Sequence, residues 1–168
     1  MQLTSQEEYG LRCLLAVARE TRDLPVGIPD IASSEGLSPE YAAKLMRLLR
    51  QGELVTSTRG ANGGYRLSRP AEQMSVWSVI EVLGGPLFHE SFCNAHSGKH
   101  DDCVHSGSAS GCSIRAMWTW VGKAIRGTLE ELTVSDLLKS ESSVAAQLQV
   151  VQLPRSNPTP DLGAGEGA

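Results

Sequence analysis

The residues best suited to chemistry are three cysteines that lie close together in the second half of the chain. Cys93, Cys103 and Cys112 follow the spacing Cys-x9-Cys-x8-Cys. The four histidines of the chain occur just before or among them: His89, His96, His100 and His105. Thiolate sulfur and imidazole nitrogen bind soft or borderline metals, so this stretch is suited to an iron–sulfur cluster or to zinc.

The spacing of these cysteines favours one of the two groups. Structural zinc sites usually contain a Cys-x2-Cys pair, which this stretch lacks, and a loop rich in glycine and serine can fold around a larger group. We therefore predict an iron–sulfur cluster and keep zinc as the alternative. A third interpretation is that the thiols bind nothing, although exposed thiols without a role are liable to oxidation.

The remaining cysteine, Cys13, lies in a different environment. It stands between Leu11 and Leu14 in an apolar segment, which favours a small buried thiol. No apolar run approaches the ~18 residues of a membrane-spanning helix, and the start of the chain, MQLTSQEEYG, has no basic flank followed by an apolar stretch. We therefore expect a cytoplasmic protein that keeps its thiols reduced and has no membrane segment.

The elements that precede the cysteines are mostly helical. Thr4 and Glu7 form a capping box, in which each side chain bonds the other residue's backbone amide, and this predicts a helix from residue 5. A short second helix is predicted over residues 29–34. Ser38 followed by Pro39 predicts the start of a third helix. A serine hydroxyl can cap the first backbone amides, and proline has no backbone N–H that would be left unpaired at the first helical position.

A basic hairpin is predicted to follow the third helix. Residues 54–59 are a β-type run, residues 60–64 a glycine-rich turn, and residues 65–67 resume the alternation. Residues 37–69 contain six Lys or Arg and two Asp or Glu, a net charge of +4, although the whole chain has a net charge of -4. A basic helix and hairpin after two helices are the plan of a DNA-binding winged helix.

Helical signals resume on both sides of the cysteine-rich loop. Ser75 is placed to cap a further helix, which the glycines at 84 and 85 end. After the last cysteine, large apolar residues recur every three or four positions: Ile114, Met117, Trp118, Val121, Ile125, Leu129 and Leu132. A helix this long at the end of a small domain needs a partner helix, and a second copy of the chain is the simplest one.

These features predict a mostly α protein with a small β-hairpin wing (α+β): a winged helix-turn-helix with a long C-terminal dimerisation helix. The predicted organisation is a DNA-binding domain over residues 1–84, a Cys/His-rich cluster-binding loop over 85–112, the dimerisation helix with a short terminal helix over 113–139, and a flexible tail over 140–168. Within this tail, residues 154–168 are rich in proline and glycine and cannot bury enough surface to order themselves.

The third helix is the predicted DNA-reading element, because a helix-turn-helix inserts its second helix into the major groove with the N-terminal end first. The residues there that could contact base edges are Ser38, Glu40, Tyr41 and Lys44. Lys44 could reach guanine acceptors. Glu40 could accept from cytosine or could simply stabilise the helix N-terminus, and both interpretations stay open.

Other basic residues are predicted to contact the DNA backbone and the minor groove. Arg47 and Arg50 lie further along the helix and suit phosphates, whereas Arg59, beside Gly60 at the wing tip, suits a narrow minor groove. The partner predicted for a dimer is double-stranded DNA with a pseudo-palindromic operator. The plainer alternative is that these charges form an ordinary solvated face.

Several segments together resemble the IscR/NsrR-type (Rrf2) family of bacterial transcription regulators. They are LTSQEEYGLRCLLAVA, IASSEGLSPEYAAKLMRLLRQGELV, STRGANGGYRLSRP, VIEVLGG, CSIRAMW and LTVSDLL, and the wing motif RGANGGYRL is the most specific. They cover roughly residues 1–139. The resemblance implies a homodimer with a long helix crossing to the partner and, in many members, an iron–sulfur cluster bound by three cysteines in the loop before that helix.

The resemblance also suggests a fourth ligand. IscR-type members have a histidine three residues after the last cysteine, but Arg115 occupies that place here. In NsrR-type members a carboxylate from the other subunit completes the site, and Glu8 stands at the matching position, where it could equally favour the helix dipole. Glu8 is the first candidate, followed by His105, His96 and His100. Whether the cluster is 2Fe–2S or 4Fe–4S is left open.

The functional prediction is a DNA-binding transcriptional regulator, of the repressor type, that senses iron–sulfur status, redox state or nitric oxide. The alternative is a zinc-stabilised or metal-independent winged-helix interaction module without cluster sensing. An enzyme is not expected, because the sequence shows no Ser-His-Asp order, phosphate-binding loop or paired-acid motif.

Overall fold

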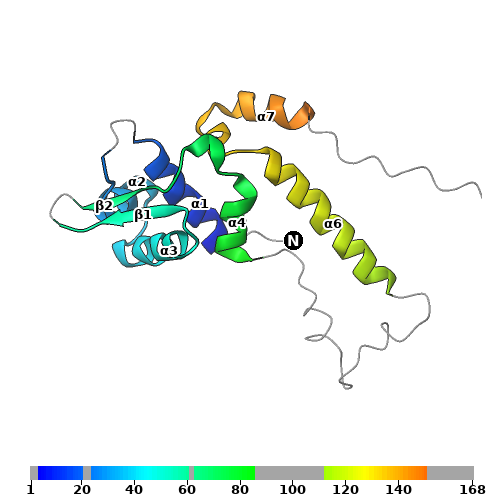
Figure 1. Cartoon of the computed structure of the whole chain (residues 1–168), viewed down its shortest axis with the longest axis horizontal. Helices are drawn as coiled ribbons and strands as arrows, with labels where there is room; N and C mark the ends of the chain where they lie inside the picture. Colours follow the sequence, from blue (N-terminus) through cyan, green and yellow to red (C-terminus); the bar gives the residue numbers. More distant parts are fainter. Residues whose placement is uncertain (1–3, 21–23, 61–62, 86–111, 151–168) are drawn as a thin grey trace, which may run out of the picture.

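The computed structural model describes residues 4–20, 24–60, 63–85 and 112–150. Its elements, in chain order, are the helices and strands α1 (Ser5–Ala18), α2 (Ile28–Glu35), α3 (Pro39–Gln51), β1 (Val55–Thr58), β2 (Gly64–Leu67), η1 (Ala71–Gln73), α4 (Val76–Gly84), α6 (Ser113–Glu131), η2 (Asp136–Leu138) and α7 (Glu141–Val150). Figure 1 shows α1 to α4 and the hairpin gathered in one body, from which α6 extends with its N-terminal end farthest away. The predicted mostly α fold with a β-hairpin wing is confirmed.

The ends of the first helices follow the capping residues that the sequence predicts. The hydroxyl of Thr4 accepts from the amide of Glu7, and the amide of Thr4 donates to the Glu7 carboxylate at 2.7 Å. Gly36 ends α2 in the left-handed conformation with φ of 66°, which suits a residue without a Cβ. The hydroxyl of Ser38 accepts from the amide of Tyr41 at 3.2 Å and begins α3.

The wing is an antiparallel hairpin that a third short segment extends. Val55 pairs with Leu67 at the base of the hairpin. Before α2, Val26 exchanges two backbone hydrogen bonds of 2.9 Å with Tyr65 on β2. A Cβ on Gly64 would collide with the Val26 carbonyl, so glycine permits this close approach. The second strand of the wing is therefore joined to the segment before α2, and Val55 of the first strand is buried in the main core.

One apolar core joins the three helices, α4 and the hairpin. Its fully buried members include Leu14, Leu45, Leu49 and Val79. Cys13 lies in the same core with none of its surface exposed, which confirms the predicted buried thiol. Burial of these side chains is the main force that holds the winged-helix body together.

The segment after α6 returns to this body. The amide of Val76 donates to the carbonyl of Leu132, and the amide of Val134 donates to the carbonyl of Met74, both at 2.8 Å. Val134 is completely buried in the main core. The C-terminal end of α6 is therefore fixed to the winged-helix body, whereas its N-terminal end is not.

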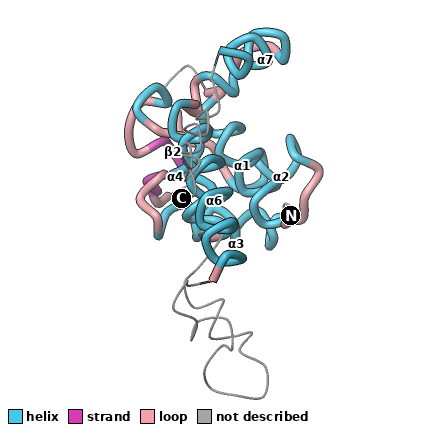
Figure 2. Tube along the Cα trace, turned by 90° about the vertical axis from the view of Figure 1, so that its right-hand side faces the viewer, coloured by secondary structure: helices cyan, strands magenta, loops and turns pink. Residues whose placement is uncertain are grey.

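The chain after Lys139 differs from the prediction. Residues 141–150 form α7, within the range 140–168 that the sequence predicts to be a flexible tail. Ala145, Gln147 and Leu148 are good helix formers, and the proline-rich and glycine-rich composition that suggested a tail begins only at residue 154. Residues 151–168 lie outside the described residues. Figure 2, turned by 90°, again shows α7 apart from α2 and α3.

The predicted short terminal helix is a 3-10 turn, Asp136–Leu138. The predicted capping bonds at its start are present. The amide of Thr133 donates to the Asp136 carboxylate at 2.8 Å, and the amide of Asp136 donates to the Thr133 hydroxyl at 3.2 Å. Within the described ranges, no helix has the length and apolar character needed to cross a membrane.

Candidate nucleic-acid interface and metal ligands

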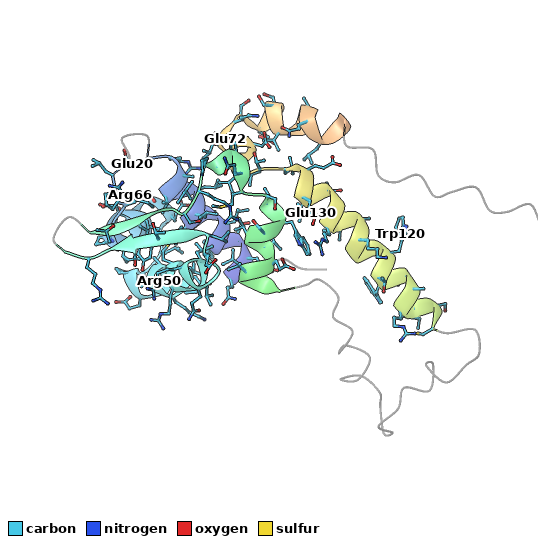
Figure 3. All side chains as sticks on the ribbon, viewed as in Figure 1. Glu20, Arg50, Arg66, Glu72, Trp120 and Glu130 are labelled. Atoms are coloured by element: carbon cyan, nitrogen blue, oxygen red, sulfur yellow. The ribbon has the colours of Figure 1, made fainter. Side chains whose placement is uncertain are left out.

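The helix α3 has one buried face and one exposed, basic face. Ala42, Leu45, Met46 and Leu49 point into the core. The opposite face exposes its cations to solvent: Lys44, Arg47 and Arg50. Figure 3 labels Arg50 on α3 and Arg66 on the wing strand β2, two cations of the same basic segment. No ion pair neutralises the three α3 cations among the described residues, so their charge is available to phosphates.

Ser38 and Glu40 are joined at the N-terminus of α3. The amide of Glu40 and the hydroxyl of Ser38 donate hydrogen bonds to the Glu40 carboxylate, which holds the pKa of Glu40 below its ordinary value. Ser38 at the same time accepts from the amide of Tyr41. Both side chains thus cap the helix, which supports the helix-terminus interpretation of Glu40. Contact with cytosine remains a prediction.

Tyr41 is half-buried, and its ring serves in packing. It meets the ring of Tyr9 on α1 edge to face, with centroids 6.2 Å apart and an interplanar angle of 78°. Such a pair stabilises beyond its buried area, by about 1 kcal/mol. Of the predicted base-contacting residues, Lys44 is therefore the one that stands on the exposed surface without a second structural role.

The wing presents Arg59 and a row of hydroxyls. Arg59 is exposed, and Gly60 follows it with φ of 114°, a conformation that L side chains rarely adopt. Thr56, Ser57 and Thr58 on β1 are all exposed as well. These hydroxyls are not among the predicted DNA-contacting residues, although serine and threonine are residue types that commonly contact phosphates.

Two of the candidate metal ligands lie in the described residues. Cys112 is half-buried and caps α6, where its sulfur accepts from the amide of Arg115 at 3.5 Å. Glu8 is exposed in the first turn of α1, and no described residue forms a hydrogen bond with its carboxylate. Arg115, at the place of the IscR-type histidine, is exposed in the first turn of α6.

The other candidate ligands lie outside the described residues: Cys93, Cys103, His96, His100 and His105. In the part of the chain that the structure describes, no group of three or more His, Cys, Asp or Glu side chains lies close enough together to hold a metal ion. The start of α1 packs against the end of α4, where Glu7 touches Gly84, whereas the N-terminal end of α6 extends away from both (Figure 1). Glu8 and Cys112 of one chain are thus not brought together.

Cys13 is buried in the core, whereas Cys112 is half-buried at the start of α6. Burial, and secondarily the charge of Glu35, raises the pKa of the Cys13 thiol to about 11. The thiolate is the form that binds metals, so Cys13 is a structural residue of the core.

The fold and the exposed basic face of α3 define a winged-helix DNA-binding protein. Residues 3–140 match the family model described as "Rrf2: Iron-dependent Transcriptional regulator". The chain belongs to the Rrf2 family, whose members are transcriptional regulators and not enzymes.

Individual relatives agree with this assignment. The chain is 34% identical over 142 residues to the protein rrf2 of Nitratidesulfovibrio vulgaris, covering 84% of this chain and 90% of that one. It is 32% identical over 142 residues to the HTH-type transcriptional regulator IscR of Photobacterium profundum, covering 84% and 78%. The solved structure of T. potens IscR superposes with a TM-score of 0.63 at 28% identity, covering 90% and 93%.

Proposed function

We propose that this regulator is a homodimeric, cytoplasmic repressor whose DNA binding responds to an iron–sulfur cluster. The observation that carries the proposal is the exposed cationic face of α3, beside a wing that exposes Arg59. Lys44 lies nearest the capped N-terminus and is positioned for base edges, while Arg47 and Arg50 follow along the helix toward phosphates. A pseudo-palindromic operator would present one half-site to each copy of α3.

The dimer part of the proposal rests on the exposure of α6. No residue of α6 is buried, and four large apolar side chains are between 41% and 55% exposed: Ile114, Met117, Trp118 and Trp120. In Figure 3 the side chain of Trp120 projects from α6 away from the winged-helix body. A second copy of α6 is the occupant that fits, because two such helices would cover each other's apolar stripe.

The metal part rests on the donor set. Cys93, Cys103 and Cys112 would hold the cluster, with Glu8 of a second chain as the first candidate for the remaining iron and His105 as the alternative. Cys112 stands at the N-cap of α6, where its sulfur is half-buried and accepts from the amide of Arg115. When bound, an iron–sulfur cluster supplies iron that nitric oxide or dioxygen can reach and a redox state that can change.

A cluster held at Cys112 would be connected to the DNA-binding body through α6. Cys112 begins α6, and Val134, just after α6, is buried in the core of the DNA-binding body. A ligand that favours one arrangement of the two α6 helices therefore also favours one separation of the two α3 helices, by thermodynamic linkage. The competing proposal, a zinc-stabilised or metal-free interaction module, lacks a reason for the uncompensated cations on α3.

The test begins with anaerobic purification, followed by visible absorption and assays of iron and acid-labile sulfide. A duplex selected by the protein from a random library then serves as the DNA probe, beside a scrambled duplex. We expect a brown protein whose affinity for the selected duplex changes by about tenfold or more when the iron is removed, as is typical of allosteric coupling. Cys93→Ala, Cys103→Ala and Cys112→Ala should each lose the iron, whereas the buried control Cys13→Ala should keep it.

Several results would contradict the proposal. A colourless protein with one zinc per chain would overturn the sensing function, and an intact cluster in Cys103→Ala would overturn the ligand set. Glu8→Gln and His105→Ala, compared by absorption and iron content, decide between the two candidates for the fourth ligand. Failure to select any duplex would overturn DNA reading by α3.

A further inference from the structure

An ion pair joins α1 to the turn that precedes the DNA-reading helix. The Arg12 Nε donates to the Glu35 Oε2 at 2.9 Å, and the Glu35 side chain is only 6% exposed. Glu35 is the last residue of α2. A buried carboxylate is costly without a partner, so this bond determines where the end of α2 can lie.

The same face of α1 also contacts the first turn of α3. The Arg12 guanidinium carbon lies 5.3 Å from the centre of the Tyr9 ring, and that ring packs edge to face against Tyr41. Tyr41 is the residue whose amide Ser38 caps. Arg12 and Tyr9 therefore contact both sides of the turn, the last residue of α2 and the first turn of α3.

A neighbouring arginine offers a natural comparison. The Arg19 Nη1 lies 3.5 Å from the Glu35 Oε1, and the Arg19 side chain is 61% exposed, against 43% for Arg12. Of the two, Arg12 makes the closer contact with Glu35 and also covers an aromatic ring. The bond that restrains the turn is therefore the one to Arg12.

We propose that Arg12 and Tyr9 are positioning residues for DNA reading: with Glu35 and Tyr41 they fix the N-terminal end of α3 relative to α1. This inference rests on the proposed reading of DNA by α3. Base contacts in the major groove depend on the placement of the helix, whereas nonspecific attraction to phosphates depends mainly on charge. Loss of the restraint should therefore lower selectivity between sequences more than it lowers binding to DNA in general.

The experiment compares Arg12→Gln, Glu35→Gln and the double variant, with Arg19→Gln as the matched control. Affinities are measured for the selected duplex and for the scrambled duplex across a series of salt concentrations. Each single variant should bind the selected duplex about tenfold more weakly, a size typical of contacts in one network, and the double variant should lose little more than either. Binding to the scrambled duplex, the salt dependence and Arg19→Gln should stay near the wild-type values.

A direct phosphate contact by Arg12 predicts a different outcome. Arg12→Gln would then weaken both duplexes alike and reduce the salt slope by about one, while Glu35→Gln would strengthen both by removing a negative charge. Either result would overturn the positioning role. Because Glu35 lies on α2, a matching loss in Glu35→Gln would show that the contact, and not Arg12 alone, is responsible.

Conservative variants separate a positioning effect from a folding defect. Tyr9→Phe keeps the ring and should retain selectivity, whereas Tyr9→Leu should lose it while its thermal unfolding still shows a folded protein. Equal selectivity in Tyr9→Leu and wild type would overturn the role of Tyr9. Lys44→Ala serves as the reference for DNA reading. If it leaves the selected duplex bound as tightly as before, the proposed reading surface fails and this inference fails with it; if Lys44→Ala weakens binding but Arg12→Gln does not, only the inference fails.

Discussion

The winged-helix body and the helix α6 use apolar residues in opposite ways. In the body, side chains such as Leu14, Leu45 and Leu49 are completely buried within one chain. In α6, which is the longest helix described, no residue is buried, and Trp118 and Trp120 are 41% and 55% exposed. The body can therefore fold from its own residues, whereas α6 has an apolar surface that a single chain leaves exposed to water.

The boundary between these two regions lies within α6 itself. Towards its C-terminus, Leu129 packs on a small cluster of Val76, Ile80 and Leu132, and the chain then enters the main core at Val134. Towards its N-terminus every side chain from Ser113 to Trp120 is exposed. The C-terminal end of α6 is thus stabilised by packing on the DNA-binding body, and the exposed N-terminal end is available to a second chain.

The largest effect that tests this comparison is expected from a pair of substitutions, one in each region. Leu49→Ala should lower the free energy of unfolding by about 3 kcal/mol, because it leaves a cavity in a closed core. Trp118→Asp should instead abolish dimerisation, because a charge would be buried between the α6 helices, and should change the unfolding of the monomeric body by less than about 0.5 kcal/mol. Urea unfolding and analytical ultracentrifugation measure the two quantities.

The two variants serve as controls for each other. Leu49→Ala should still form dimers at concentrations where it is folded. A dimeric Trp118→Asp would show that the exposed face of α6 is not the interface, and an equally destabilised body in both variants would remove the distinction between the two regions.

The next largest effect is expected at Asp136, which holds the connection between α6 and α7. Lys139, the Thr133 hydroxyl and the Thr133 amide all donate to its carboxylate, at 2.6 to 2.8 Å, and hold the pKa of Asp136 well below its ordinary range. Asp136→Asn should lower the free energy of unfolding by about 2 kcal/mol at pH 7, since charge-assisted bonds are lost.

The pH dependence of this difference follows from the direction of the shift. Because the pKa of Asp136 is depressed in the folded chain, its contribution is complete above the ordinary Asp pKa of about 4 and declines as the pH falls below that value. The gap between wild type and Asp136→Asn should therefore be constant from neutral pH to about pH 5 and narrow in stronger acid. A constant gap down to pH 2 would contradict the ionised network.

Those parts of the fold that depend on neighbouring residues could be predicted from the sequence. Thr4, Gly36 and Ser38 mark helix ends through bonds that span only a few residues, and the wing motif indicates a turn in the same local way. The helix α7 was not predicted, because the composition of the last fifteen residues was extended to the fourteen before them, residues 140–153. A local signal was present there, but it was outweighed by the average.

The DNA-contacting residues and the metal ligands of the candidate site could be predicted to different degrees. The exposure of Lys44 and Arg47 agrees with their predicted role in contacting DNA, and Leu45 and Leu49 lie on the opposite, buried side of the helix. The contact of Arg12 with Glu35 could not be foreseen, because the two residues are 23 positions apart and neither stands in a local motif. The cluster ligands, except for Cys112 and Glu8, lie outside the described residues and stay predictions.

The smallest effect is expected at the joint where α6 rests on the body. The Arg126 guanidinium lies 5.6 Å from the centre of the Trp77 ring and pairs with Glu130 at 2.7 Å. Trp77 is 6% exposed, and its indole nitrogen is buried without a hydrogen-bond partner among the described residues. The guanidinium of Arg126 thus lies over an aromatic ring that belongs to the body.

In a Trp118→Phe, Trp120→Phe background Trp77 is the single indole, so its fluorescence reports on this joint alone. Arg126→Ala should shift its emission towards longer wavelengths by exposing the ring. Arg126→Met should not, because its long unbranched side chain can still cover the ring without the charge. Replacing Trp118 by aspartate instead of phenylalanine in this background should leave the Trp77 emission unchanged, because the C-terminal end of α6 is held by its own chain. An emission shift in that variant would show that the second chain, and not the body, holds α6 in place along its whole length.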